Sequence, residues 1–155
     1  MKTRLCSDVL KALEGKTLAT AESLTGGGIG AAITAVSGAS AVYKGGVVSY
    51  TNEIKHKVLG VSREILDAHG AVSAPVAKEM AAGVRKLLSA DVAVSVTGLA
   101  GPGGDEYGNP VGTVFIGYED GTRAEVHRYL FAGTREEIRE QTILGALELV
   151  LHNQK

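Results

Sequence analysis

Cysteine, tryptophan and long apolar runs are scarce or absent in this chain of 155 residues. The single cysteine, Cys6, excludes a disulfide within the chain, and we expect it to be a small buried residue of the first helix, not a reactive thiol. No apolar run of about 18 residues and no signal-peptide pattern occurs. These absences argue against a disulfide scaffold and a membrane-spanning protein, and they favour a cytoplasmic one.

Neither sign of charge is in excess. The chain has 16 basic and 17 acidic residues, so it lacks the electrostatic footprint of a protein that binds nucleic acid or an anionic membrane. Its aromatic residues are too few for a base-stacking strip. The histidines follow no metal-binding spacing, so we expect no metal and no cofactor. They are His56, His69, His127 and His152.

Glycine is abundant, and its first cluster follows a serine. A buried strand is predicted over Thr17–Ala21 and a helix over Gly26–Val36, with Ser23 in the turn between them. Such a turn leaves backbone N–H groups free and suits a nucleophile, and an anionic ligand group could lie on those amides. The alternative is that the glycines only permit close packing and a tight turn.

A second segment offers that serine a base. The β-branched strand predicted over Gly46–Tyr50 breaks at Thr51-Asn52-Glu53, and Lys55 follows within one helical turn of that break. A serine hydroxyl needs a base to take its proton, and a desolvated lysine can act as one, with Tyr50 relaying or orienting the proton. The alternative is an ordinary solvated helix lysine, like Lys57.

A third segment is a strand predicted over Asp91–Thr97 that leads into a loop with glycine at 98, 101, 103, 104 and 108. The loop has neither the P-loop spacing nor the dinucleotide fingerprint. Because it follows a buried strand end, we expect its backbone to approach a ligand closely. A long surface connection is the alternative.

In this order the motifs AESLTGG, VVSYTNEIK and VTGLAGPGG, with NPVGTV after them, resemble the CinA C-terminal-domain family. Its characterised members are nicotinamide-nucleotide amidohydrolases. The resemblance implies a serine nucleophile at Ser23, a lysine base at Lys55 and an assisting tyrosine at Tyr50. The implied reaction converts nicotinamide mononucleotide to nicotinic acid mononucleotide and ammonia in pyridine-nucleotide salvage. Many members carry a much larger N-terminal domain, so only the amidohydrolase half is inferred.

The resemblance also implies a substrate-binding set. Thr97 matches a position near the bound substrate, and one of two late arginines is implied to reach the nucleotide phosphate, in some cases across a subunit boundary. Which arginine does so stays open, and a homodimer or higher homo-oligomer is expected. Glu22 is expected to orient the loop, because strand alternation points it away from Ser23. The candidate substrate-binding residues are Glu22, Thr25, Gly26, Gly27, Thr97, Gly98, Ala100, Gly101, Gly103, Arg135 and Arg139.

The order of elements predicts one α/β domain over residues 1–155. We expect a three-layer α/β/α sandwich around a mixed, mainly parallel sheet, with an antiparallel hairpin in the second half. Ser73 and Thr134 are predicted to cap the helices that they begin. The remaining predicted elements are helices over Leu5–Leu13, Asn52–Leu59, Ser62–His69, Ser73–Ser89 and Thr134–His152, and hairpin strands over Val111–Tyr118 and Ala124–Phe131.

Two other functions use the same residues differently. A non-catalytic module that binds a pyridine nucleotide would need the glycine loops and arginines, but not the trio Ser23, Tyr50 and Lys55. A partner domain for DNA-uptake or damage-response proteins is indicated only by the family's name, and the balanced charge argues against direct contact with nucleic acid.

Overall fold

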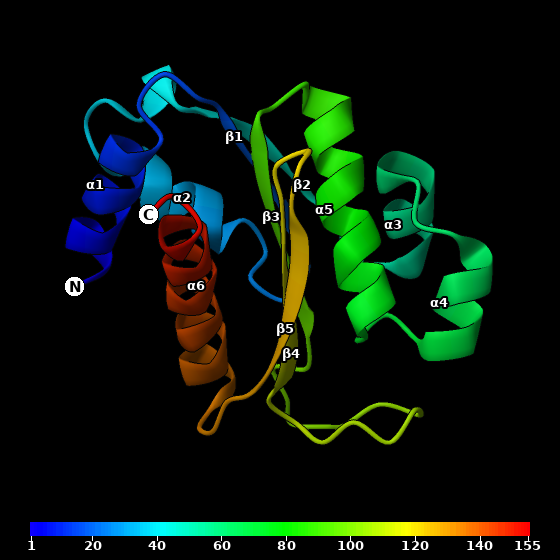
Figure 1. The fold of residues 1–155 in the computed structure, drawn as a ribbon. Helices are drawn as coiled ribbons and strands as arrows, with labels where there is room; N and C mark the ends of the chain where they lie inside the picture. The colour runs from blue at the N-terminus through cyan, green and yellow to red at the C-terminus, as the bar shows by residue number, and fades with distance from the viewer.

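The computed structural model describes residues 1–155 and has a five-stranded sheet covered by helices on both faces (Figure 1). The strand order is β2-β1-β3-β4-β5; the pairs β2–β1 and β1–β3 are parallel, and β3–β4 and β4–β5 are antiparallel. The mixed sheet and its hairpin are therefore confirmed. The strands are β1 (Leu18–Glu22), β2 (Tyr43–Val48), β3 (Val92–Gly98), β4 (Thr113–Glu119) and β5 (Ala124–Leu130).

Helices lie on both sides of the sheet (Figure 1). No helix is both long enough and apolar enough to cross a membrane. One side has α1 (Lys2–Ala12), α2 (Gly28–Thr34) and α6 (Arg135–His152). The other has α3 (Asn52–Leu59), α4 (Arg63–His69) and α5 (Ala74–Leu88), and a short 3₁₀ turn, Ala39–Ala41, leads into β2. Of these helices, α2, α5 and α6 contact the strands, whereas α1 packs on α2 and α6, and α3 and α4 pack on α5.

The central strand β3 divides the apolar core into two clusters. Val94 and Val96 belong to the cluster under α1, α2 and α6, whereas Ala93 belongs to the cluster under α5. Side chains alternate along a strand, so this nearly fully buried strand serves both layers. Its polar members also face α5, because Ser95 Oγ donates a hydrogen bond to Ala77 O at 2.6 Å.

Of the two predicted capping residues, Thr134 caps its helix and Ser73 does not, and Thr51 is a cap that was not predicted. Thr134 forms a full capping box with Glu137. Thr51 accepts a hydrogen bond from the Ile54 amide and so fixes the first turn of α3. Ser73 precedes α5, but the prediction that its side chain caps the helix is wrong, because its hydroxyl donates to Gly70 O instead.

The second strand lies earlier in the chain than predicted. It covers Tyr43–Val48, not Gly46–Tyr50, so Ser49 and Tyr50 lie beyond its end. Gly46 lies in the strand as predicted, and β1 packs so closely beside it that a Cβ at this position would lie 2.2 Å from Thr20 Oγ1. The missed first half of the strand, residues 43–45, ends in a glycine, and glycine lowers strand propensity.

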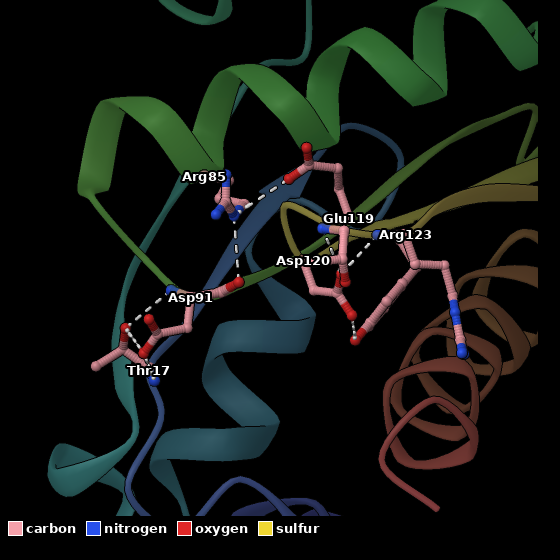
Figure 2. Close-up of polar contacts among 8 residues, drawn as sticks. Thr17, Arg85, Asp91, Glu119, Asp120 and Arg123 are labelled. Atoms are coloured by element: carbon pink, nitrogen blue, oxygen red, sulfur yellow. Dashed lines mark hydrogen bonds and ion pairs between the residues drawn. The ribbon is translucent and has the colours of Figure 1, made fainter.

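A polar cluster closes the sheet where β1 and β3 begin (Figure 2). The Asp91 carboxylate accepts hydrogen bonds from Thr17 N at 2.8 Å and Thr17 Oγ1 at 3.1 Å. Arg85 donates to Asp91 O and pairs with Glu119, both at 3.2 Å. Asp120, in the β4–β5 turn, accepts from the Arg123 amide. Charged groups here are held by partners of opposite charge or by hydrogen-bond donors.

Candidate active site

A serine and a lysine meet at the opposite end of the sheet, where β1 and β2 end. Ser23 directly follows β1, and its amide donates to Val96 O on the neighbouring strand. Lys55 lies in the first turns of α3, and its Nζ is 3.0 Å from Ser23 Oγ. Both side chains are buried, with Lys55 only 1% exposed. The predicted nucleophile and base are therefore in direct contact.

The burial of the amine makes it easier to deprotonate than an ordinary lysine. Nζ of Lys55 donates to Ser49 O at 2.7 Å and to Tyr50 O at 3.4 Å, and no ion pair of the chain includes Lys55. Burial without a carboxylate partner lowers the pKa of Lys55 to about 8. A neutral amine has two hydrogens and one lone pair. If the two carbonyls take the hydrogens, the lone pair is left for the Ser23 hydroxyl.

Ser49 is a part of this arrangement that sequence reasoning missed. It contributes a backbone carbonyl, and any residue type supplies one, so no pattern could have identified it. Its amide donates to Glu22 O at 2.8 Å, which ties the end of β2 to the residue before Ser23. Its own hydroxyl is buried without a hydrogen-bond partner.

Glu22 occupies the start of α2. Its carboxylate accepts hydrogen bonds from Thr25 Oγ1 at 2.6 Å, Ile29 N at 2.8 Å and Gly30 N at 3.0 Å. A carboxylate is the favoured partner of a helix N-terminus. The amides of Ile29 and Gly30 are thus taken, so the expectation that an anionic ligand group binds amides of this turn applies only to those nearer Ser23. Glu22 is placed to orient the turn that carries Ser23, and it does not line the pocket described below.

The two late arginines of α6 have separate positions. Arg139 donates from Nε to Leu24 O at 2.9 Å and from Nη2 to Thr25 O at 3.1 Å, so its guanidinium is engaged by the turn after Ser23. Arg135 is exposed; it donates to Tyr50 Oη at 3.3 Å and to a backbone carbonyl of the glycine loop. Of the two, only Arg135 lines the pocket.

The pocket beside Ser23 and Lys55 has a volume of about 290 Å³. This is near the lower end of typical small-ligand sites, which begin at about 300 Å³. The predicted residues that line it are Ser23, Tyr50, Lys55, Thr97, Gly98, Ala100, Gly101, Gly103 and Arg135. Leu24, Ala71, Val72 and Leu99 also line it and were not predicted. Glu22, Thr25, Gly26, Gly27 and Arg139 do not line it.

Two predicted polar side chains in the pocket have partners other than the catalytic pair. Thr97 Oγ1 donates to Ala71 O at 2.9 Å, which leaves its oxygen lone pairs to accept from a ligand. Tyr50 is 60% exposed, and its hydroxyl accepts from Arg135. Only its backbone carbonyl contacts Lys55. An assisting role for the Tyr50 hydroxyl therefore stays a prediction.

Other parts of the surface lack a comparable arrangement. A hollow of about 420 Å³ lies along β5 and α6, and one of about 690 Å³ lies beside α3 and α4. Both are larger than the Ser23 pocket, but neither holds a nucleophile in contact with a base. No three His, Cys, Asp or Glu side chains lie close enough together to hold a metal ion.

The family model for the CinA C-terminal domain matches residues 2–153. A CinA-like protein of Endomicrobium trichonymphae is 50% identical over 135 residues, which are 87% of this chain and 32% of that relative. The chain spans about a third of the length of the curated relatives it matches.

Solved structures agree with this match. The competence damage-inducible protein A of Klebsiella pneumoniae subsp. pneumoniae MGH 78578 superposes with a TM-score of 0.95 at 38% identity, covering 97% of this chain and 95% of that one. A competence-damaged protein (CinA) superfamily protein of Enterobacter cloacae superposes with a TM-score of 0.97 at 33% identity, covering 100% and 93%.

Proposed function

The chain belongs to the CinA C-terminal domain family, and from this premise we propose that it is an amidohydrolase that converts nicotinamide mononucleotide to nicotinic acid mononucleotide and ammonia. The substrate class comes from the family resemblance. The chemistry is supported by one observation above all, the 3.0 Å contact between Ser23 Oγ and a buried Lys55 amine that has no carboxylate partner.

In the proposed first half-reaction the substrate acylates Ser23. Neutral Lys55 takes the hydroxyl proton as the oxygen attacks the carboxamide carbon, and the carbonyl oxygen becomes an oxyanion. The protonated amine then gives that proton to the departing nitrogen. The C–N bond breaks, ammonia leaves, and the nicotinoyl group remains esterified to Ser23.

The second half-reaction restores the serine. Lys55, neutral again, takes a proton from a water molecule that attacks the ester carbon. The amine returns the proton to Ser23 Oγ as the ester bond breaks, and nicotinic acid mononucleotide leaves. One water is consumed and one ammonia is formed in each cycle, and Lys55 ends in its starting state.

The two ends of the nucleotide would be recognised by different parts of the pocket. The carboxamide must lie against Ser23, which is 7% exposed and therefore at the bottom of the pocket. Arg135 is the better placed of the two arginines to meet the phosphate, because it is exposed and lines the pocket. Arginine suits this role, since its planar fork pairs with phosphate oxygens.

The rival proposal is a module that binds the nucleotide without reacting. Binding alone does not require a buried lysine with a lowered pKa, and removing such a group from water costs free energy. Perturbed groups of this kind in a cleft are typical of catalytic sites. The pair of Ser23 and Lys55 therefore favours catalysis.

The test is the release of free ammonia from nicotinamide mononucleotide by the purified protein. We expect steady turnover, and we expect Ser23→Ala to abolish it while the thermal unfolding temperature stays close to that of the wild type. Ser7→Ala, which removes a hydroxyl on α1 far from the pocket, is the matched control. Full turnover by Ser23→Ala would contradict covalent catalysis, and nucleotide binding without ammonia release by the wild type would support the binding module.

A further inference from the structure

We propose that Tyr107 and Asn109 form a clasp that fastens the glycine loop between β3 and β4 (residues 99–112), and that this clasp sets how tightly the pocket binds the mononucleotide. The two are positioning residues, because neither lines the pocket. The inference rests on the proposed function for its ligand and on the observed hydrogen bonds of the loop for its geometry. It concerns the binding of the substrate, not the chemical step at Ser23.

The glycine loop is a part of the pocket that gains most from being fastened. Its residues Leu99, Ala100, Gly101 and Gly103 line the pocket. The loop has glycine at 101, 103, 104, 108 and 112, and glycine has more backbone freedom to lose than any other residue. A loop that became ordered only on binding would lower the affinity by the cost of that ordering. Fastening the loop in advance therefore strengthens binding without a new contact to the ligand.

The clasp is built on a turn, residues 105–109, that one carboxylate holds together. Oδ1 of Asp105 accepts hydrogen bonds from the amides of Tyr107 at 3.0 Å and Asn109 at 2.9 Å, and Oδ2 accepts from Asn109 Nδ2 at 2.8 Å. Burial raises the pKa of Asp105, but the hydrogen bonds from Asn109 and Tyr107 outweigh it and lower the pKa below its usual value. The carboxylate is therefore charged at neutral pH, and hydrogen bonds to a charged acceptor are the stronger kind.

The same turn is fastened to the connection between α4 and α5. Asn109 Nδ2 donates to Val72 O at 3.1 Å, and the Tyr107 hydroxyl donates to Asp67 O at 2.9 Å. The Tyr107 ring also lies so close to Gly70 that a Cβ there would be 2.6 Å from the ring. Because Val72 itself lines the pocket, Asn109 ties the glycine loop to a second part of the pocket lining, distant in sequence.

The reacting pair is held by other bonds. The amide of Ser23 donates to Val96 O, and Lys55 Nζ donates to Ser49 O at 2.7 Å, so neither side chain is held in place by the clasp. Loss of the clasp should therefore leave the chemical step almost intact and weaken the binding of the ligand. A split between the two constants distinguishes this role from general destabilisation of the fold, which would not act on KM alone.

The experiment compares Asn109→Ala with Asn153→Ala. Asn153 is the matched control, because its Nδ2 also donates to a carboxylate, Glu125 Oε1 at 2.7 Å, and to a carbonyl, Leu149 O at 3.0 Å. For Asn109→Ala we expect KM for the mononucleotide to rise by about tenfold and kcat to change by less than about threefold, since a hydrogen bond of ordinary net strength corresponds to a factor of about ten. Asn153→Ala should change neither constant. An unchanged KM in folded Asn109→Ala, or a fall in kcat alone, would overturn the proposal.

Binding is measured directly in the Ser23→Ala background, where no turnover consumes the ligand. In isothermal titration calorimetry with nicotinamide mononucleotide, adding Asn109→Ala should raise the dissociation constant by about tenfold. Tyr107→Phe removes only the bond to Asp67 O, from a side chain that is 44% exposed, and should raise the dissociation constant by about threefold. Should Asn109→Ala fail to fold, Tyr107→Phe decides, and an unchanged dissociation constant in that variant would overturn the proposal.

A third readout follows the loop itself. Hydrogen exchange measured by mass spectrometry reports how often backbone amides open, and peptides that cover residues 99–112 should exchange faster in unliganded Asn109→Ala than in the wild type. The same peptides should exchange at the wild-type rate in Asn153→Ala. Equal exchange in Asn109→Ala and the wild type would mean that the clasp does not fasten the loop, and would overturn the proposal.

These readouts separate the two proposals. If the wild type releases no ammonia, but Ser23→Ala binds the mononucleotide and Asn109→Ala weakens that binding, the proposed reaction is wrong and the clasp stands. If ammonia is released with the same KM in the wild type, Asn109→Ala and Tyr107→Phe, the reaction stands and the clasp is wrong. No binding of the mononucleotide to Ser23→Ala and no release of ammonia by the wild type would overturn both.

Discussion

At one end of the sheet Lys55 is buried against two carbonyls and a hydroxyl, whereas at the other end Arg85, Glu119 and Asp120 are each bound by charged or polar partners (Figure 2). Both regions use the ends of strands, and both bring together residues distant in sequence. They differ in whether the charged side chain has a partner that stabilises its charge: Lys55 has no carboxylate partner, whereas Arg85 pairs with Glu119.

The pKa values follow this difference. Burial alone lowers the pKa of Lys55 to about 8, so about a tenth of the amine is uncharged at pH 7, far more than for a lysine of ordinary pKa. Burial raises the pKa of Asp120, but hydrogen bonds from the amides of Arg123 and Thr122 outweigh it and lower the pKa to about 2, so this carboxylate stays charged. Lys55, which has no partner of opposite charge, can therefore exchange a proton during a reaction. Asp120, whose charge is stabilised by hydrogen bonds, contributes to the stability of the fold instead.

The largest effect is expected from removing the Lys55 amine, which has no carboxylate partner. For Lys55→Met we expect ammonia release to fall by about 10⁴-fold or more, because the Ser23 hydroxyl loses its base. Lys57→Met is the control, since Lys57 is exposed on the same helix and should keep full activity. The wild-type kcat should rise with pH through about 8, as Lys55 loses its proton, and this rise should be absent from the variant. Equal losses in both variants would contradict the assignment.

The pH dependence of stability gives the next largest effect. The unfolded chain keeps the Lys55 proton up to the ordinary lysine pKa of 10.5, whereas the folded chain releases it near 8. The unfolded state therefore binds more protons between these values, and the folded state gains stability as pH rises from about 8 to 10.5. We expect a gain of about 3 kcal/mol relative to Lys55→Met, measured by urea unfolding. Parallel pH curves for both proteins would contradict a lowered pKa.

A substitution at the other end of the sheet, in the β4–β5 turn, should have the smallest effect, and it should change only the free energy of unfolding. Asp120→Asn loses a charged acceptor of several hydrogen bonds, so we expect unfolding to become easier by about 1 kcal/mol at pH 7, after allowance for its partial exposure. The folded pKa is lowered, so this contribution is present above pH 3.8 and lost as pH falls through about 2. The value of kcat should not change; a clear fall would contradict a purely structural role.

Much of the fold could be predicted because hydrophobic periodicity and caps are local signals. The helix predicted over Asn52–Leu59 has those bounds, and the hairpin around Asp120-Gly121 is present. The predictions failed at the ends of β2, which begins at Tyr43 and ends at Val48, not at Gly46 and Tyr50 as predicted. The expected homo-oligomer and the cytoplasmic location stay predictions.

Some residues of the site could be predicted together with their contacts, whereas for others only their position followed from the sequence. Ser23 and Lys55 follow from the strand-to-helix turn and the family motifs, and the structure brings them together. The division of labour between Arg135 and Arg139 could not be predicted, because it depends on which carbonyls lie within reach of each guanidinium after α6 has packed. Sequence spacing places both arginines on one helix but does not say what each one contacts.

The closeness of Ser23 and Lys55 has a consequence for covalent inhibition. An alcohol and a partly uncharged amine 3.0 Å apart are two nucleophiles that one small electrophile can engage together. A reagent with two reactive centres one atom apart would bridge the end of β1 to α3. Lysines that remain fully protonated would react far more slowly, so selectivity would come from the protein itself.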